Sequence, residues 1–163
     1  MSERRKVVYC WDTSVFLAWI NEENGAPLAD IQLIAEEIES GKAVLVVPVT
    51  IATEVLGSKM SPTQRNKFEL FLKRPEVVVA ETTLAIARKA GAIRDEGLLR
   101  NPKLKVKTPD ATIVATAIIY QCDALHSLDK RGSGPLKLTD LPSVKGLKIC
   151  KPVLVSGQKG LEY

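Results

Sequence analysis

The feature that most constrains this chain is a helix-forming segment with no charged residue on any face, Ala111 to Tyr120. A helix-start signal precedes it, with Thr108 as the expected N-cap and Pro109 as the first helical residue. A helix that is apolar on every side must be covered all round, so we expect it to be buried against a sheet. The apolar run from Ala124 to Leu128 follows and predicts a buried strand.

Segments typical of strands and of helices alternate along the rest of the chain. Short apolar runs that end at Trp11, Val47 and Val79 predict three more strands, and segments with helical spacing of apolar residues separate them. This alternation predicts an α/β fold, a three-layer α/β/α sandwich with a mainly parallel central sheet. We expect residues 1–163 to form a single domain with a core of about 7–155, ending in one or two edge strands.

Composition and apolar runs limit the class of protein. The longest mostly apolar stretch, Ala43 to Ala52, is too short to span a bilayer. Residues 1–6 lead directly into a strand pattern and not into an apolar signal segment, so we predict a cytoplasmic protein with no membrane association. The cysteines, Cys10, Cys122 and Cys150, have no CxxC spacing and are expected to be buried thiols in a reducing compartment.

Four acidic residues occupy equivalent places in the predicted fold. Asp12 ends the first strand and Glu54 lies on the helix after the second, while Asp110 begins the buried helix and Asp129 ends the strand that follows. Each acid alone could be a helix cap, an exposed helix residue or a turn former. Right-handed βαβ connections would nevertheless bring all four to one rim of the sheet.

Carboxylates crowded at one rim repel each other unless a cation lies between them. Hard divalent cations prefer carboxylate and water oxygens over the nitrogen of histidine or the sulfur of cysteine. We therefore predict one or two Mg²⁺ or Mn²⁺ ions at this rim, with four residues as both metal ligands and catalytic residues: Asp12, Glu54, Asp110 and Asp129.

Basic residues gather in the last third of the chain. Residues 1–97 carry 12 Lys and Arg against 14 Asp and Glu, whereas residues 98–163 carry 11 against 5. This excess favours a polyanion such as nucleic acid as a partner, and an ordinary solvated surface is the alternative. The basic residues beside the predicted acidic site are Arg100, Lys103, Lys105, Lys107 and Lys130.

Other chemistries find less support. The single histidine, His126, lies within a predicted strand and is expected to be a packed or hydrogen-bonded side chain, which argues against Ser–His and Cys–His nucleophilic schemes. The chain contains no GxSxG, GxxxxGK[ST] or GxGxxG motif. Phosphoryl transfer through a nucleophilic Asp12 stays open, although phosphatases of the haloacid dehalogenase type carry a second Asp where this chain has Ser14.

Four short motifs, in order, resemble those of PIN-domain nucleases. The first is an apolar strand that ends in Asp-Thr-Ser, Val8 to Leu17, and the second is the helical acid of Thr53-Glu54-Val55. The third, Pro109 to Ala117, is an Asp-Ala pair followed by an Ala-Thr-Ala helix, and the fourth is Ser127-Leu128-Asp129. The resemblance covers about residues 7–155 and departs from the commonest pattern at Trp11, which is bulkier than usual.

This resemblance implies a metal-dependent endoribonuclease like the VapC-type toxins, which form homodimers and are held inactive by an antitoxin protein. On this hypothesis Ser14 and Ser127 orient the carboxylates, and the five basic residues named above bind the RNA backbone. The alternative from another class is a catalytically idle PIN-like module that binds RNA or a protein through the same surface.

Overall fold

The computed structural model describes residues 5–129 and 134–155. Within those ranges five strands form one sheet in the order β3-β2-β1-β4-β5, and every neighbouring pair is parallel. The strands are β1 Val7–Trp11, β2 Ala43–Pro48, β3 Val77–Ala80, β4 Ala124–His126 and β5 Lys148–Cys150. The parallel sheet that the alternating pattern predicted is therefore confirmed.

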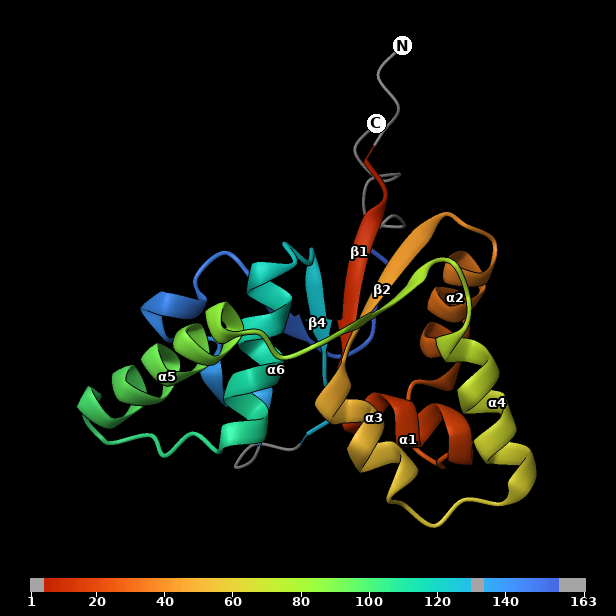
Figure 1. The fold of residues 1–163 in the computed structure, drawn as a ribbon, viewed down its shortest axis with the longest axis horizontal. Coiled ribbons are helices and arrows are strands. Elements are labelled where there is room, and N and C mark those ends of the chain that lie inside the picture. The colour runs from red at the N-terminus through yellow and green to blue at the C-terminus, as the bar shows by residue number, and fades with distance from the viewer. Residues whose placement is uncertain (1–4, 130–133, 156–163) are drawn as a thin grey trace.

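Six α-helices in the described ranges cover the sheet. They are α1 Thr13–Asn21, α2 Leu28–Glu39, α3 Val49–Leu56, α4 Pro62–Leu72, α5 Leu84–Leu99 and α6 Thr108–Ile119. Figure 1 shows α1, α2 and α4 on one side of the strands and α5 and α6 on the other, which is the expected three-layer sandwich. Two short 3₁₀ helices follow β4, η1 Pro135–Leu138 and η2 Pro142–Val144. None of the helices in the described part of the chain is both long and apolar enough to cross a membrane.

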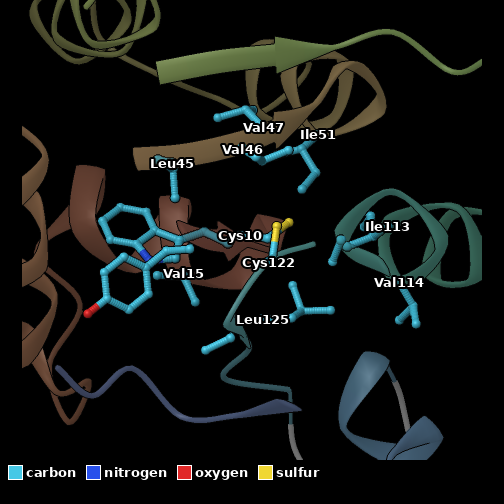
Figure 2. Close-up of a cluster of buried hydrophobic side chains, with 14 of the residues drawn as sticks. Cys10, Val15, Leu45, Val46, Val47, Ile51, Ile113, Val114, Cys122 and Leu125 are labelled. Atoms are coloured by element: carbon cyan, nitrogen blue, oxygen red, sulfur yellow. The ribbon is translucent and has the colours of Figure 1, made fainter. Parts of the chain in front are cut away.

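The central helix α6 is buried over most of its length, as its uncharged sequence predicts, but Ile119 and Tyr120 at its C-terminal end are exposed. Every residue from Ala111 to Ala117 is buried, and the helix packs against α5 and the sheet. Figure 2 shows Ile113 and Val114 of this helix near Cys10 of β1 and Leu125 of β4. The Cys10 thiol forms a hydrogen bond with Cys122, and this bond together with burial raises the pKa of Cys10 well above its ordinary value. Both are free thiols that are buried in the core, whereas the free thiol of Cys150 is only partly buried, so the expected burial holds for two of the three cysteines.

An aromatic cluster fills the opposite layer. The Trp11 ring at the end of β1 is fully buried and packs edge-on against Phe16, with ring centroids 5.3 Å apart. It also stacks on Phe71 of α4, and Trp19 of α1 joins the same cluster. The bulky residue before Asp12 thus anchors the end of β1 in the core.

Two boundaries differ from those predicted. Helix α6 begins at Thr108 with Lys107 as its N-cap, so Thr108 is not the cap, and no side chain caps this end. Thr108 is instead inside the first turn, where its carbonyl oxygen accepts a hydrogen bond from Thr112. Strand β4 ends at His126, earlier than expected, so Asp129 follows the strand at a distance of three residues and does not end it. Ser127, directly after the strand, donates a hydrogen bond to Asp12. In the described residues the edge of the sheet beside β4 holds one short strand, β5, in agreement with the expected one or two edge strands.

The strand order creates a crevice between β1 and β4. From β1 the chain proceeds outward through β2 and β3, then returns to place β4 on the other side of β1. In open parallel sheets, ligands bind outside the carboxyl ends of the strands at such a reversal. Asp12 follows β1 directly, and Ser127 to Asp129 follow β4, so these residues lie on the two sides of that crevice.

Candidate active site

Asp12 is the buried centre of the crevice. It is the N-cap of α1, and its carboxylate accepts a hydrogen bond from the backbone N–H of Val15 at 3.3 Å. The hydroxyls of Ser14 and Ser127 each donate to a different oxygen of the same carboxylate, both at 2.5 Å. Asp12 is therefore a helix cap and also the point at which β4 is joined to β1.

The two serines carry this connection further along the chain. Ser14 Oγ accepts a hydrogen bond from Leu128 N at 2.9 Å, and Ser127 Oγ accepts one from Asp129 N at 3.2 Å. Each hydroxyl thus joins the Asp12 carboxylate to the backbone that leads into Asp129. The segment after β4 is held in register with the start of α1 by these contacts.

The electrostatic state of Asp12 is unusual for a carboxylate. Its side chain is 2% exposed, and burial raises its pKa from 3.8 to about 7. The hydrogen bonds from Ser127 and Ser14 lower this pKa, and the charge of Asp129 raises it. No Lys or Arg forms an ion pair with Asp12 within residues 5–129 and 134–155. Its negative charge is thus uncompensated there.

The other three acids come from separate elements. Glu54 of α3 is exposed, and its Oε2 accepts a hydrogen bond from the Thr13 hydroxyl at 2.6 Å. Asp110, in the first turn of α6, is partly buried, and burial raises its pKa, followed by the charges of Asp129 and Glu54. The nearby lysines Lys107 and Lys137 lower the pKa of Asp110.

One cavity of about 380 Å³, here called the acidic cavity, contains all four acids in its wall. Asp12, Glu54, Asp110 and Asp129 contribute to the lining together with a single basic residue, Lys107. The structure therefore brings together the four acids that the sequence places at one rim. Whether they bind a metal and catalyse a reaction stays a prediction.

Gly134 forms part of this wall and fixes the place of Asp129. Its backbone has φ +88°, a conformation that residues with a side chain rarely adopt. A Cβ atom on Gly134 would overlap Oδ2 of Asp129 and would lie 2.5 Å from its Cγ. Only glycine can thus approach the Asp129 carboxylate this closely.

The donor chemistry of the acidic cavity suits a hard divalent cation. Carboxylate oxygens from four separate elements face a cavity with one lysine, and two of the four pKa values are raised. Among the residues that the structure describes, no group of three or more Asp, Glu, His or Cys side chains lies close enough to hold an ion together. At these separations a hard divalent cation would be bound by one or two carboxylates directly, with waters in the remaining positions.

The five predicted phosphate-binding residues occupy different surroundings. Arg100 forms an ion pair with Asp140 at 3.6 Å, and Lys103 is exposed on the loop before α6 without lining the acidic cavity. Lys107 lines that cavity, while Lys105 lines a smaller one beside it. Lys130 lies outside the described residues.

His126 is packed, as the sequence predicts, but it is not hydrogen-bonded. Its ring lies 5.2 Å from that of Tyr9 and is fully buried, and neither ring nitrogen has a hydrogen-bond partner among the described residues. Burial lowers the pKa of His126 to about 4, with a smaller effect from the charge of Lys148. His126 also does not line the acidic cavity, so it cannot act there as a base.

Sequence reasoning missed three residues of this site. Thr13 contacts Glu54 and could have been noticed as the neighbour of Asp12 in the first motif. Gly134 and Lys137 were not identified, because a glycine in a Gly-rich loop and a lysine in a basic segment carry no distinguishing local signal.

Comparisons with known proteins bear on the family and the fold. A model of the PIN domain matches residues 9–133 of the chain. No curated protein sequence matches it. Solved structures share its fold at low sequence identity. In two of the three examples that follow, the similarity covers nearly the whole length of the matched chain.

The first is VapBC2 from Rickettsia felis bound to a DNA fragment from its promoter, 18% identical, covering 88% of this chain and 97% of that one, with a TM-score of 0.61. DNA-bound VapBC from Salmonella typhimurium is 17% identical, covers 88% and 96%, and has a TM-score of 0.58. VapC20 of Mycobacterium tuberculosis, a toxin that cleaves the sarcin-ricin loop, is 16% identical, covers 74% and 89%, and has a TM-score of 0.55.

Proposed function

The chain belongs to the PIN domain family, and we propose that it is an endoribonuclease that hydrolyses RNA phosphodiesters with the help of Mg²⁺ or Mn²⁺. Proteins of this family are nucleases and generally use divalent metal ions. The observation that carries the proposal is the acidic cavity, where four carboxylates from separate elements meet at the crevice between β1 and β4.

In this proposal the carboxylates of Asp12, Glu54, Asp110 and Asp129 hold the metal, directly or through water. A bound divalent ion would offset negative charge on the phosphate and activate a water for attack on phosphorus. The roles of the protein residues follow from their contacts. Ser14 and Ser127 fix both oxygens of Asp12, and Thr13 restrains the exposed Glu54.

The cation beside the acids has its own role. Lys107 lies in the wall of the acidic cavity and can contact a phosphate oxygen of the substrate. Without such a cation, four carboxylates would repel an RNA strand before the metal could bind it. The rival scheme, in which Asp12 itself attacks phosphorus, fits poorly because Asp12 is buried and both of its oxygens accept hydrogen bonds.

Two partners belong to the same proposal. The structures with this fold include VapBC complexes, and we propose that this chain is likewise the toxin of a toxin–antitoxin pair. On this proposal it forms a homodimer, and an antitoxin protein holds it inactive.

The decisive experiment is cleavage of a mixed-sequence single-stranded RNA by purified protein. The reaction is run with Mg²⁺, with Mn²⁺ and with excess chelator, and in parallel with single-stranded DNA of the same sequence. We expect metal-dependent cleavage of RNA that falls at least about a hundredfold in Asp110→Asn, because removing even an outer partner of a metal ligand costs 10–100-fold.

Asp95→Asn is the matched control, since Asp95 is an exposed acid on α5 outside both cavities of the site. It should cleave like the wild type. RNA binding without cleavage under every metal condition would replace the proposal with an idle RNA-binding module. Trapping of a phosphorylated Asp12 would replace it with phosphoryl transfer.

A further inference from the structure

A second, smaller cavity adjoins the acidic cavity. It measures about 80 Å³ and lies between the loop before α6, the first turn of α6, and η1. Its lining shares Lys107, Asp110 and Gly134 with the acidic cavity, so the two are neighbours along one wall. We call it the side cavity.

The charge of the side cavity is opposite to that of its neighbour. Three lysines line it, Lys105, Lys107 and Lys137, against the single acid Asp110. None of these lysines forms an ion pair with a carboxylate in residues 5–129 or 134–155. Arg100 is different, because Asp140 already neutralises it. The cations of the side cavity are therefore available to an anion.

The backbone that carries these lysines is held in place by the protein core. Leu104 N donates a hydrogen bond to the carbonyl of Gly97 at 2.8 Å, and Arg94 Nε donates to the carbonyl of Val106 at 3.1 Å. Gly97 permits this approach, since a Cβ there would lie 2.5 Å from the Leu104 carbonyl oxygen. The side chains of Val106 and Leu138 are buried beneath the cavity. Lys105 thus lies on a loop that is hydrogen-bonded to α5, and Lys137 lies next to the buried Leu138 of η1.

We propose that the side cavity binds the RNA phosphate next to the scissile phosphate, with Lys105 and Lys137 as its cationic contacts and Lys107 between the two phosphates. The proposal rests on the nuclease function proposed above. An RNA strand that enters a cavity of four acids meets repulsion, and a cationic cavity at its side supplies the attraction that holds the strand in register. Phosphate contacts of this kind position a strand without reading its sequence.

The test neutralises one phosphate and one lysine in turn. A short RNA with a single cleavage site is synthesised in two forms, each with a neutral methylphosphonate at one of the linkages that flank the scissile bond. With wild-type protein we expect one of the two forms to lose about tenfold in kcat/KM, the size of one charge-assisted contact. With Lys137→Gln the same replacement should cost less than about twofold, because the partner of that phosphate is already gone.

Lys145→Gln is the matched control, because Lys145 lines a cavity at the opposite edge of the sheet. With Lys145→Gln protein, the methylphosphonate should lower kcat/KM by the full tenfold, as it does with the wild type. Lys137→Gln should also lower the slope of log affinity against log salt by about 0.7, the value for one phosphate contact on a single strand. If each of the two methylphosphonates lowers kcat/KM as much for Lys137→Gln as for the wild type, the side cavity does not bind a flanking phosphate.

A binding measurement separates this inference from the nuclease proposal. The same RNAs are titrated into Asp12→Asn protein with chelator present, with and without Lys137→Gln, because Asp12 does not line the side cavity. Coupling between Lys137 and one linkage in binding, without cleavage by the wild type, would uphold the phosphate site and overturn the nuclease. Cleavage by the wild type without such coupling would uphold the nuclease and overturn the phosphate site.

Discussion

Two carboxylates at opposite ends of the β1–β4 strand pair have very different electrostatic surroundings. At the end where β1 and β4 begin, Asp123 accepts a hydrogen bond from Val8 N at 2.8 Å and lies 3.4 Å from the guanidinium of Arg5. At the end where they finish, Asp12 is buried among hydroxyl donors with no cation paired to it in the described residues. The first charge is neutralised by the protein, and the second is not.

The cavities at these two edges also differ in charge and not in volume. A cavity of about 360 Å³ at the Asp123 edge has nearly the volume of the acidic cavity, about 380 Å³. Its lining contains two basic residues, Arg5 and Lys145, and a single acid, Asp123. Volume therefore does not distinguish the two edges, whereas uncompensated charge does. A buried carboxylate whose pKa is strongly raised is costly for stability, and such sites are typical of function.

The largest expected effect concerns the cost of the Asp12 charge. The pKa of Asp12 in the folded protein, about 7, lies above its ordinary value of 3.8, so the folded state binds this proton more tightly than the unfolded state. The resulting stability is fully present below about pH 4 and is lost as pH rises through 7. In chelator, the stability of Asp12→Asn relative to the wild type should therefore increase by about 2 kcal/mol between pH 5 and pH 8, because only the wild type must ionise a buried carboxyl group.

Urea unfolding at the two pH values measures this gain, with Asp95→Asn as the exposed control. An equal difference between Asp12→Asn and wild type at both pH values would show that Asp12 carries no such penalty. The charge of Asp12 would then be as well compensated in the folded protein as that of Asp123.

The next effect uses one glycine from each edge. Gly134 and Gly146 both have positive φ, +88° and +102°, but a Cβ on Gly146 would meet nothing within 4 Å. Both alanine substitutions strain the backbone by about 1 kcal/mol, and only Gly134→Ala also displaces the Asp129 carboxylate. We expect Gly134→Ala to lose about tenfold or more in kcat/KM, since small misplacements in a site are costly.

Gly146→Ala should keep activity within about twofold of the wild type. Thermal unfolding should show the larger loss of stability for Gly134→Ala, because only there does the added Cβ also clash with Asp129. Titration of Mn²⁺ binding gives a second readout that backbone strain alone would leave unchanged. Matching activity and metal affinity in the two variants would mean that Gly134 does not position Asp129.

The smallest effect belongs to the compensated edge. The Arg5–Asp123 pair is exposed, with side chains 62% and 34% accessible, so solvent screens it. Arg5→Gln should cost less than about 1 kcal/mol of unfolding free energy, and the difference should shrink in high salt. RNA cleavage should be unchanged. A loss of activity in this variant would place a functional role at the edge that we regard as structural.

Much of the fold could be predicted from the sequence because its signals are local. Uncharged residues 111–120 identify a buried helix, and apolar runs that end in polar residues identify parallel strands. Asp12 could be placed directly after a strand by this pattern alone, whereas the pattern made the strand before Asp129 too long, since β4 ends at His126. The exact helix start at Thr108 could not be predicted, because a threonine before a proline suits the cap and the first turn alike.

The surroundings of each site residue were decided by contacts between distant parts of the chain. Ser127 donates to Asp12 across 115 residues, and Arg100 is neutralised by Asp140 from the segment after η1. A count of lysines and arginines treats Arg100 and Lys137 as equals, but one is paired with a carboxylate and the other lines a cavity.

The sequence by itself determined which residue types meet at the rim of the sheet, since periodicity and strand ends depend on neighbours along the chain. Only the tertiary structure decided which charges are compensated. Asp123 and Asp12 are the same amino acid beside the same strand, and they differ because Arg5 reaches one of them while two hydroxyls and the core enclose the other. Burial and the pairing of charges depend on three-dimensional packing, and these set the electrostatic free energy of a carboxylate.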